Sequence, residues 1–259
     1  MDFDGDGDSD ISVFREGSWL ISGGPTYTLG QAGDIPVPGD YDGNGILQPA
    51  VFRPSTGYWL ICTANSGVAG NCEVTTTPHG ANGDIPVPAD YDGDGDTDLA
   101  VFRPSNATWY VSGNQPVVFG LSTDIPVPAD YDGDGDADLA VFRNGSWRMQ
   151  GLGNSTLGQA GDIPVPGDYD SDGIADKAVF RPSAGQWWVC KPGSCPEYTF
   201  GQSGDLPVPA DYDGLGKLIM AVFRPSNATW YLYQGSSTVF GQATDIPSPK
   251  RPAYPGYPY

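Results

Sequence analysis

Four aspartates at alternating positions form the most distinctive chemical pattern of this sequence. In the stretch DYDGDGDTDLAVFR, positions 1, 3, 5 and 9 are Asp90, Asp92, Asp94 and Asp98. Glycines between them allow the positive φ angles of a tight turn, so alternate carboxylates can converge on one point. Such carboxylates repel each other unless a cation lies between them, and Ca²⁺ takes six to eight oxygen ligands in flexible geometry. The pattern predicts a calcium loop, with the carbonyl of Asp96 at position 7 as a further ligand.

The residues after the loop exclude an EF-hand. That motif needs a bidentate glutamate at position 12, where this chain has Val101 within an apolar LAVF run. We therefore expect the loop to lead directly into a β-strand.

Six copies of the loop show that one unit is repeated along the chain. They begin near Asp2, Asp40, Asp90, Asp130, Asp168 and Asp211. A regular repeat of about 40 residues determines the architecture of a protein. We number the loops one to six in chain order, as residues 2–10, 40–48, 90–98, 130–138, 168–176 and 211–219.

Four loops keep every acidic ligand, and for these we predict strong calcium sites. Besides loop three, they are formed by Asp2, Asp4, Asp6, Asp8 and Asp10; by Asp130, Asp132, Asp134, Asp136 and Asp138; and by Asp168, Asp170, Asp172, Ile174 and Asp176, where the position-7 residue contributes its carbonyl. We expect these cations to be structural, because each site is a complete carboxylate cage inside a repeat.

Loops two and six lack part of the ligand set. Loop two has Asp40, Asp42 and Asn44, but Gln48 replaces the aspartate at position 9, so we predict a doubtful site. Loop six keeps carboxylates only at positions 1 and 3, and Lys217 could reach back and neutralise them. Loop six is therefore predicted to bind no calcium.

The elements around the loops read as short strands. The chain has 259 residues, of which 39% are apolar, with 37 Gly and 25 Pro throughout. In the unit that starts at Asp84, apolar runs at 85–89, 98–102, 108–112 and 116–120 are separated by turns. Four short antiparallel strands per repeat are typical of a β-propeller blade. The fold class predicted is therefore all-β, a six-bladed propeller of four-stranded antiparallel blades.

Prolines and the two chain ends predict how the ring is built. Pro86 and Pro88 lie two residues apart, so one side of their strand has no N–H groups, which suits an inner edge strand. The chain begins at a loop without such a strand and has one at 245–249, so we expect 245–249 to complete blade one and close a domain of residues 1–249. Donation of that strand to a neighbouring molecule, forming a filament, is the alternative. Residues 250–259 form a Pro/Tyr-rich tail that we expect to be extended, as a linker or docking segment.

Repeated aromatic and basic residues are expected to support the blades. One tryptophan per unit favours packing between blades, and one arginine per unit favours pairing with the aspartate of the Asp-Ile-Pro motif. If the propeller binds sugar, the varying residues beside the repeated tryptophans are better candidates: Trp188, Tyr110 and Tyr231.

Cysteines and sequons bear on the compartment. Cys62 with Cys72 and Cys190 with Cys195 each bracket a turn, which favours hairpin disulfides over free thiols, although other pairings stay open. Sequons occur at Asn106, Asn144, Asn154 and Asn227, where glycosylation and a turn role weigh equally. Disulfides together with calcium indicate an extracellular or cell-surface protein. Met1 directly precedes loop one, without a secretory signal, so we expect a mature or trimmed form.

These motifs resemble the FG-GAP/VCBS repeats of calcium-binding propellers, best known from integrin α-chain heads. The resemblance rests on the DxDGDGxxD loop and on Phe-Gly at Phe119, Phe200 and Phe240, and it covers nearly the whole chain. Six units instead of seven, and Phe-Arg-Pro instead of Gly-Ala-Pro, mean that integrin-like ligand recognition is not implied. Similar propellers are also fungal and bacterial lectins and polysaccharide-lyase domains, so the fold alone does not give the function.

Charge and chemistry narrow the functions that we expect. A net charge of −20 argues against nucleic acid and against anionic membranes as partners, and no apolar run is long enough for membrane insertion. The sequence offers no Ser-His-Asp set or glutamate pair, so we expect no enzyme activity. We predict a non-enzymatic adhesion or structural module whose partners are calcium and a glycan or protein ligand, or copies of itself. A lectin, a filament subunit and an appendage of a larger carbohydrate-active enzyme are the alternatives.

Overall fold

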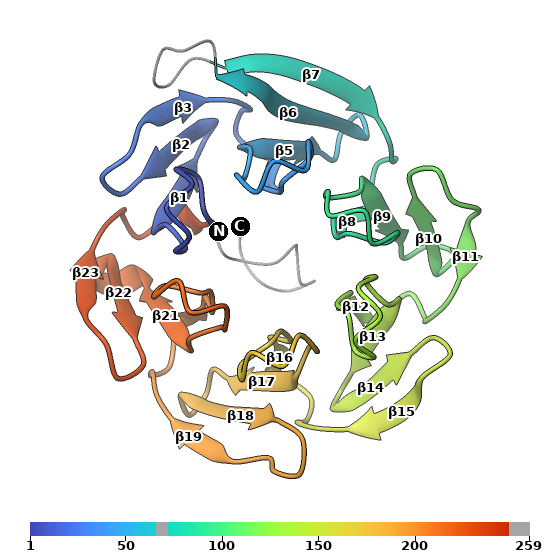
Figure 1. Ribbon diagram of the computed structural model, residues 1–259, viewed down its shortest axis with the longest axis vertical. Coiled ribbons are helices and arrows are strands. Elements are labelled where there is room, and N and C mark those ends of the chain that lie inside the picture. The colour runs from blue at the N-terminus through green and yellow to red at the C-terminus, as the bar shows by residue number, and fades with distance from the viewer. Residues whose placement is uncertain (66–71, 249–259) are drawn as a thin grey trace.

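Six four-stranded antiparallel sheets surround a central axis in the computed structural model, which describes residues 1–65 and 72–248 (Figure 1). The predicted six-bladed β-propeller is therefore confirmed. From the inner to the outer strand, blade one is β24 (Ile246–Pro247), β1 (Ser12–Arg15), β2 (Ser18–Ile21) and β3 (Thr26–Thr28). Blade two is β4 (Ile35–Pro36), β5 (Ala50–Arg53), β6 (Tyr58–Asn65) and β7 (Cys72–Pro78). Blade three is β8 (Ile85–Pro86), β9 (Ala100–Arg103), β10 (Thr108–Val111) and β11 (Val117–Val118).

The other three blades repeat this order. Blade four is β12 (Ile125–Pro126), β13 (Ala140–Arg143), β14 (Ser146–Met149) and β15 (Gly153–Thr156); blade five is β16 (Ile163–Pro164), β17 (Lys177–Arg181), β18 (Gln186–Cys190) and β19 (Glu197–Thr199); blade six is β20 (Leu206–Pro207), β21 (Ala221–Arg224), β22 (Thr229–Leu232) and β23 (Ser237–Val239). A short 3₁₀ turn, η1 (Pro225–Asn227), precedes β22. Among the described residues, no helix reaches the length and hydropathy that a membrane span requires.

The hydrophobic core lies between neighbouring blades because side chains alternate along each strand. In blade three, the fully buried Phe102 contacts the repeated Trp109, with ring centroids 5.4 Å apart. Val101, also fully buried, belongs instead to the cluster that contains Trp59 of blade two. All six repeated tryptophans are at most 1% exposed, which confirms the predicted packing role.

Each inner strand is an edge strand that pairs on one side only, as the prolines predicted. β8 pairs only with β9, and the Val87 N–H donates to the Ala100 carbonyl at 2.8 Å. The alternating Pro86 and Pro88 have no N–H to leave unpaired on the side away from β9. The strands are shorter than the sequence runs, since β8 covers two residues and the chain then reaches the loop through a single bridge between Ala89 and Asp98.

The last described strand closes the ring within one chain. β24 pairs antiparallel with β1, aligning Val13 with Pro247 and Phe14 with Ile246. The Ser248 N–H adds a hydrogen bond to the Ser12 carbonyl at 2.8 Å. The predicted closure of blade one by the C-terminal strand is thereby confirmed. Pro249 and the tail 250–259 lie outside the described residues.

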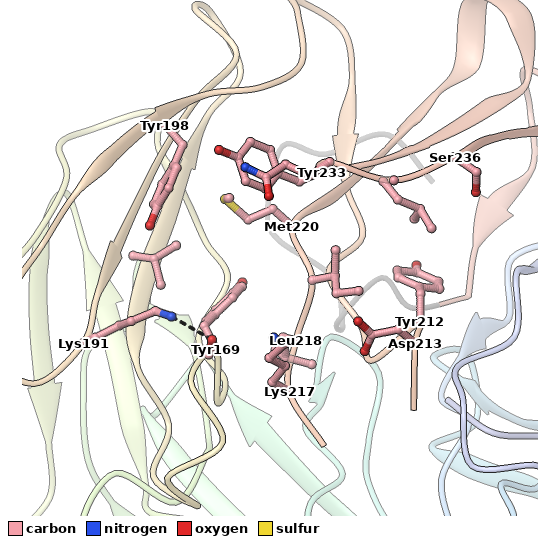
Figure 2. Close-up of a pocket in the computed structure, with 15 residues that line it drawn as sticks. Tyr169, Lys191, Tyr198, Tyr212, Asp213, Lys217, Leu218, Met220, Tyr233 and Ser236 are labelled. Atoms are coloured by element: carbon pink, nitrogen blue, oxygen red, sulfur yellow. Dashed lines mark hydrogen bonds between the residues drawn. The ribbon is translucent and has the colours of Figure 1, made fainter. Parts of the chain in front are cut away.

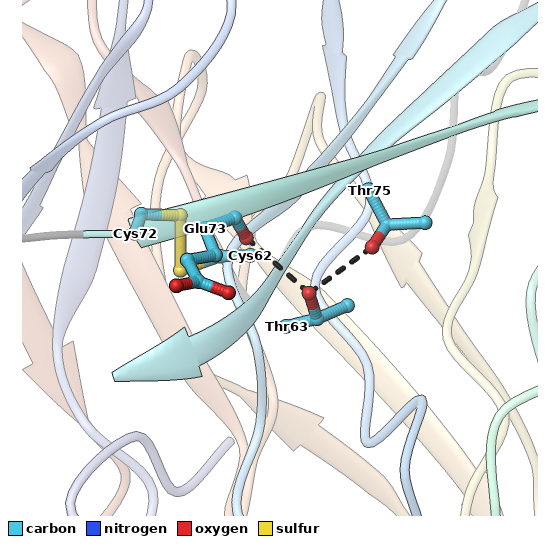
Figure 3. Close-up of a disulfide and its surroundings, with 5 residues drawn as sticks. All are labelled: Cys62, Thr63, Cys72, Glu73 and Thr75. Atoms are coloured by element: carbon cyan, nitrogen blue, oxygen red, sulfur yellow. Dashed lines mark hydrogen bonds between the residues drawn. A yellow bond between two sulfur atoms is a disulfide. The ribbon is translucent and has the colours of Figure 1, made fainter. Parts of the chain in front are cut away.

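Both predicted disulfides are present, and no cysteine is free. The Cys62–Cys72 bond joins β6 to β7 (Figure 3). Beside it, the Thr63 hydroxyl lies 3.3 Å from the Glu73 carbonyl and 3.1 Å from the Thr75 hydroxyl. The second disulfide joins the end of β18 to the turn before β19. Each bond therefore holds one outer hairpin of a blade.

Candidate metal centres

Carboxylates converge in the four loops for which strong sites are predicted. Within the described residues, one ligand oxygen from each of three aspartates lies within 4.8 Å of the others in every one of these loops. The clusters are Asp2, Asp4 and Asp6; Asp90, Asp92 and Asp94; Asp130, Asp132 and Asp138; and Asp168, Asp170 and Asp176. The remaining predicted carboxylates, Asp10, Asp98, Asp134 and Asp172, lie in the same loops but outside these clusters.

Backbone amides shape each loop around its first aspartate. In loop three, Asp90 Oδ1 accepts from the Gly93 N–H at 2.7 Å and Oδ2 accepts from the Gly95 N–H at 2.9 Å. Both glycines have positive φ, at 72° and 93°, which brings their amides round to one carboxylate. Further on, Asp94 Oδ1 accepts from the Asp96 N–H at 3.0 Å. The chain thus holds the aspartates together by hydrogen bonds of the loop itself.

The aspartate at position 9 connects the loop to the blade. Asp98 Oδ2 accepts from the Tyr91 N–H at 2.9 Å, and the Tyr91 hydroxyl donates to the Val87 carbonyl at 2.7 Å. Burial, and then the charges of Asp92 and other loop carboxylates, raise the pKa of Asp98 against the lowering effect of its backbone hydrogen bond. In loop five, burial is again the main cause that raises the pKa of Asp176, to about 6. A divalent cation would offset both the burial of these carboxylates and the repulsion between them.

Loop two is closed by an amide at the place where a cation would lie. Gln48 Nε2 donates to Asp42 Oδ1 at 2.9 Å and to the Ile46 carbonyl at 2.8 Å. These two oxygens are the ligands expected at positions 3 and 7. Gln48 Oε1 accepts from the Tyr41 N–H at 2.6 Å, as the position-9 carboxylate does in loop three. The amide nitrogen therefore bridges two oxygens that would otherwise face a metal, so calcium binding by loop two stays a doubtful prediction.

Loop six keeps the backbone shape without the acidic cluster. Asp211 Oδ2 accepts from the Gly216 N–H at 2.8 Å, but positions 5 and 9 are Leu215 and Ile219. The expectation that Lys217 neutralises the remaining pair is wrong, because in the described chain it forms no ion pair. Its side chain lines a pocket instead.

Hydrogen bonds join the six loops into a closed circle. The amide at position 8 of each loop donates to the carbonyl at position 1 of the preceding loop, as from Ala137 to Asp90 at 2.7 Å and from Thr97 to Asp40 at 2.6 Å. The circle closes from Ser9 to Asp211 at 2.6 Å. The residue whose carboxylate heads each loop therefore also carries a bond between blades. Nothing in the local sequence pattern indicated this coupling.

Arginine–aspartate pairs lie near the entry to each inner strand, as predicted. Arg103 Nε and Nη2 donate to the two oxygens of Asp84, both at 2.8 Å. Asp84 Oδ2 also accepts from the Ala81 N–H at 2.8 Å. The same bidentate pair occurs in all six blades, and the aspartate side chains are at most 2% exposed. Each pair is electrically neutral, so these arginines are structural partners of the aspartates.

The three predicted sugar contacts are half-buried beside these arginines. Guanidinium carbons lie 4.3 Å from the ring centroid of Tyr110, 4.2 Å from that of Trp188 and 4.3 Å from that of Tyr231. Each arginine covers one face of its ring, so that face cannot stack on a sugar. A role in sugar binding stays a prediction for these residues. The four sequon asparagines, Asn106, Asn144, Asn154 and Asn227, are all exposed, and their glycosylation also stays a prediction.

The sequence reasoning missed a pocket between blades five and six (Figure 2). Its lining includes Lys191, Tyr198, Lys217 and Tyr233, which come from both blades. One signal was available in the sequence, because these residues depart from the six-fold pattern of the repeat.

Comparison with known proteins agrees with the fold. The model of the FG-GAP-like repeat family matches residues 90–141, which contain loops three and four, so the resemblance is confirmed there. A solved structure of an Agrocybe aegerita lectin, described as recognising non-reducing terminal N-acetylglucosamine, aligns with a TM-score of 0.57 and 17% identity, over 95% of this chain and 77% of the lectin chain. At this identity the likeness shows the fold alone. Among curated proteins, none matches this sequence.

Proposed function

We propose that this β-propeller with an FG-GAP-like repeat is a calcium-stabilised, non-enzymatic binding module that works outside the cell. The observation that supports it most is the convergence of three carboxylates in each of four loops. Backbone amides that shape the loops, and position-9 aspartates with raised pKa, are further support. Hard oxygen donors in a loop of this kind suit Ca²⁺ better than softer transition metals.

Carboxylates at positions 1, 3, 5 and 9, with the carbonyl at position 7, would hold the cation. Bound calcium would supply positive charge that neutralises the clustered aspartates. Since the position-1 residue also accepts the hydrogen bond between loops, fixing its carboxylate would stabilise the contact between blades. A cation that binds only the folded chain adds about 3–4 kcal/mol per site at 100 to 1,000 times the dissociation constant.

Repetition of one geometry supports a structural role over catalysis. A cluster of three carboxylates recurs in four loops, whereas catalytic groups form a single site of distinct roles. The chain also contains one histidine, and its aspartates are taken up by loops and arginine pairs. The proposed location outside the cell rests on the two disulfides, because such bonds persist in oxidising compartments.

Calorimetric titration of chelator-treated protein with Ca²⁺ tests this proposal, together with thermal unfolding in the presence and absence of chelator. We expect about four sites and a clear fall of the Tm when calcium is removed. An unchanged Tm and no heat of binding would contradict the calcium proposal. Magnesium is the control cation, since it demands a stricter octahedral geometry.

Glycan binding is the second candidate for the module. It is favoured by the lectin with the same fold and by the tyrosine-lined pocket between blades five and six. A glycan array probed with the calcium-loaded protein tests it. Saturable binding to a defined sugar would support a lectin, and no binding to any sugar on the array would favour adhesion to a protein ligand.

A further inference from the structure

The pocket between blades five and six combines positive charge with aromatic walls. It has a volume of about 650 Å³, which is the size of typical small-ligand sites. In Figure 2, Lys191 and Tyr198 of blade five lie on one side, and Tyr233 of blade six lies across from them. We propose that this pocket binds a saccharide that carries a carboxylate, such as a uronic or sialic acid residue. The inference rests on the glycan-binding candidate and names its site and sugar class.

Two lysines supply the charge that selects a carboxylate. Lys191 Nζ donates one hydrogen bond to the Tyr169 carbonyl at 2.8 Å, which orients the ammonium and leaves two of its protons for a ligand. Lys217 has no ion pair within residues 1–65 and 72–248. Six arginines are held by aspartates, and four basic residues of the described chain lack an ion pair: Arg148, Lys177, Lys191 and Lys217. Two of these four line this one pocket.

The concentration of lysines is notable because the chain is strongly acidic. With a net charge of −20, the protein repels anions at long range, but this repulsion is screened beyond about 8 Å at physiological salt. Lysines at the contact distance therefore decide whether an anion binds. Two lysines without an ion pair line this pocket, together with one aspartate, Asp213.

Loop six contributes Lys217 to the pocket and has no acidic cluster. Position 7 is aspartate in loops one, three and four but Lys217 in loop six, and positions 5 and 9 are the uncharged Leu215 and Ile219. In the four acidic loops, a sugar carboxylate would face clustered aspartates. Here the same part of the blade offers a cation. The loop that is predicted to bind no calcium is thus the one that offers a cation to a sugar carboxylate.

Aromatic and polar groups in the pocket suit a sugar ring. The Tyr233 ring packs in T-shaped contacts with the rings of Tyr198 and Phe200, whose centroids lie 5.6 Å and 5.4 Å from its own. The aromatic wall therefore spans both blades. Aromatic rings offer large apolar surfaces for the C–H faces of a pyranose. At the rim, the exposed Asp213 and Ser236 can exchange hydrogen bonds with hydroxyl groups. A carboxylate on such a ring would turn toward the lysines.

Binding of matched sugars tests the proposal. We would titrate the calcium-loaded protein with methyl β-glucuronide, with N-acetylneuraminic acid and with methyl β-glucoside, a neutral counterpart of the first. We expect at least one acidic sugar to bind about tenfold to a hundredfold more tightly than the glucoside, and this preference to fall as salt is raised. Equal affinity for acidic and neutral sugars, or no binding of either acid, would overturn the proposal.

Lysine variants locate the site. Lys191→Met and Lys217→Met should each weaken acidic-sugar binding about tenfold or more, whereas Lys177→Met, which removes an unpaired lysine outside the pocket, should leave it unchanged. Unchanged binding in both pocket variants, at an unaltered Tm, would refute the assignment. If an array sugar still binds the double variant Lys191→Met/Lys217→Met, the lectin function stands while this site fails. Nuclear magnetic resonance shifts at Tyr198 and Tyr233 on sugar addition give a readout that needs no variant.

Discussion

Arg15 and Asp245 lie 230 residues apart in the sequence and form the bidentate ion pair that closes the propeller. Arg15 Nε donates to Asp245 Oδ1 at 2.6 Å and Nη2 donates to Oδ2 at 2.7 Å. In the other blades the same pair joins residues 19 apart, such as Arg103 and Asp84. The Asp245 side chain is 0% exposed and Arg15 is 35% exposed. Because β24 and β1 align over only two residue pairs, this ion pair is a principal contact of the closure.

Arg15→Met should therefore destabilise the protein and free its C-terminal strand. The change leaves the Asp245 carboxylate buried without its partner, which costs about 2–3 kcal/mol when the exposure of Arg15 is taken into account. Urea unfolding measures this loss, and limited proteolysis should show faster cleavage near residue 245. Arg103→Met is the matched control, since it should cost a similar amount without exposing the C-terminal strand. Equal cleavage in the two variants would contradict a special role for the closing pair.

Asp90→Asn should remove one calcium site. The carboxylate of Asp90 belongs to the loop-three cluster and accepts one backbone hydrogen bond on each oxygen, so an amide there removes the charge and one of the two accepted bonds. We expect calorimetry to show one site fewer than the wild type. Asp211→Asn makes the same change in loop six, which has no acidic cluster, and should leave the number of sites unchanged. A loss of calcium in the control but not in Asp90→Asn would reverse the assignment of the loops.

Gln48→Asp should create an additional site in loop two. The substitution removes the amide that donates to Asp42 and the Ile46 carbonyl and restores the carboxylate found at position 9 of the four acidic loops. We expect the calcium stoichiometry to rise by one and the Tm in chelator to fall, because the bridging hydrogen bonds are lost. Gln48→Asn, which adds no charge, should lower the Tm in chelator without gaining a site. An unchanged stoichiometry in Gln48→Asp would show that loop two is inactive for another reason.

The pH dependence of stability should change sign with calcium. Burial raises the pKa of Asp176 to about 6 from the ordinary value of 3.8, and the pKa of Asp10, Asp98 and Asp138 is raised in the same direction. Between these values the folded, metal-free protein binds more protons than the unfolded chain, so its stability falls as pH rises through this window. Calcium requires deprotonated ligands, so its contribution grows with pH.

Thermal unfolding at two pH values measures this reversal. In chelator we expect a higher Tm at about pH 5 than at about pH 7.5, and with saturating calcium the opposite order. The same order in both conditions would contradict the proposed competition between protons and calcium.

The two disulfides should differ in their effect on stability. The Cys62–Cys72 bond spans 10 residues and Cys62 is buried within the cluster that joins blades one and two. The Cys190–Cys195 bond spans 5 residues at the tip of a short hairpin. Loop entropy predicts a loss of about 2–3 kcal/mol for the longer loop and less for the shorter one. Paired serine variants, followed by urea unfolding, compare them, and a larger loss for the Cys190/Cys195 variant would disprove this ranking.

Sequence alone determined the features that depend on local pattern and on repetition. Alternating aspartates and glycines define a loop by themselves, and six copies with their proline strands imply six blades. The missing inner strand at Asp2 and the extra one at Asp245 also predicted closure, because each blade needs the same four strands. Pairing of each arginine with an aspartate followed from a scarcity of basic residues in an acidic chain.

Only the tertiary structure decided the features that arise between blades. The hydrogen bond from Ala137 to Asp90 joins two loops whose patterns are each complete without it, so no spacing rule contains it. Side-chain geometry that charge alone does not specify decides the direction of the Gln48 amide and the absence of an ion pair at Lys217 in the described chain. The pocket of Lys191 and Tyr233 exists because two adjacent blades bring unlike residues together. The repeated pattern specifies the strands, loops and ion pairs that all blades share. Contacts between unlike residues of neighbouring blades produce features that occur once, such as this pocket.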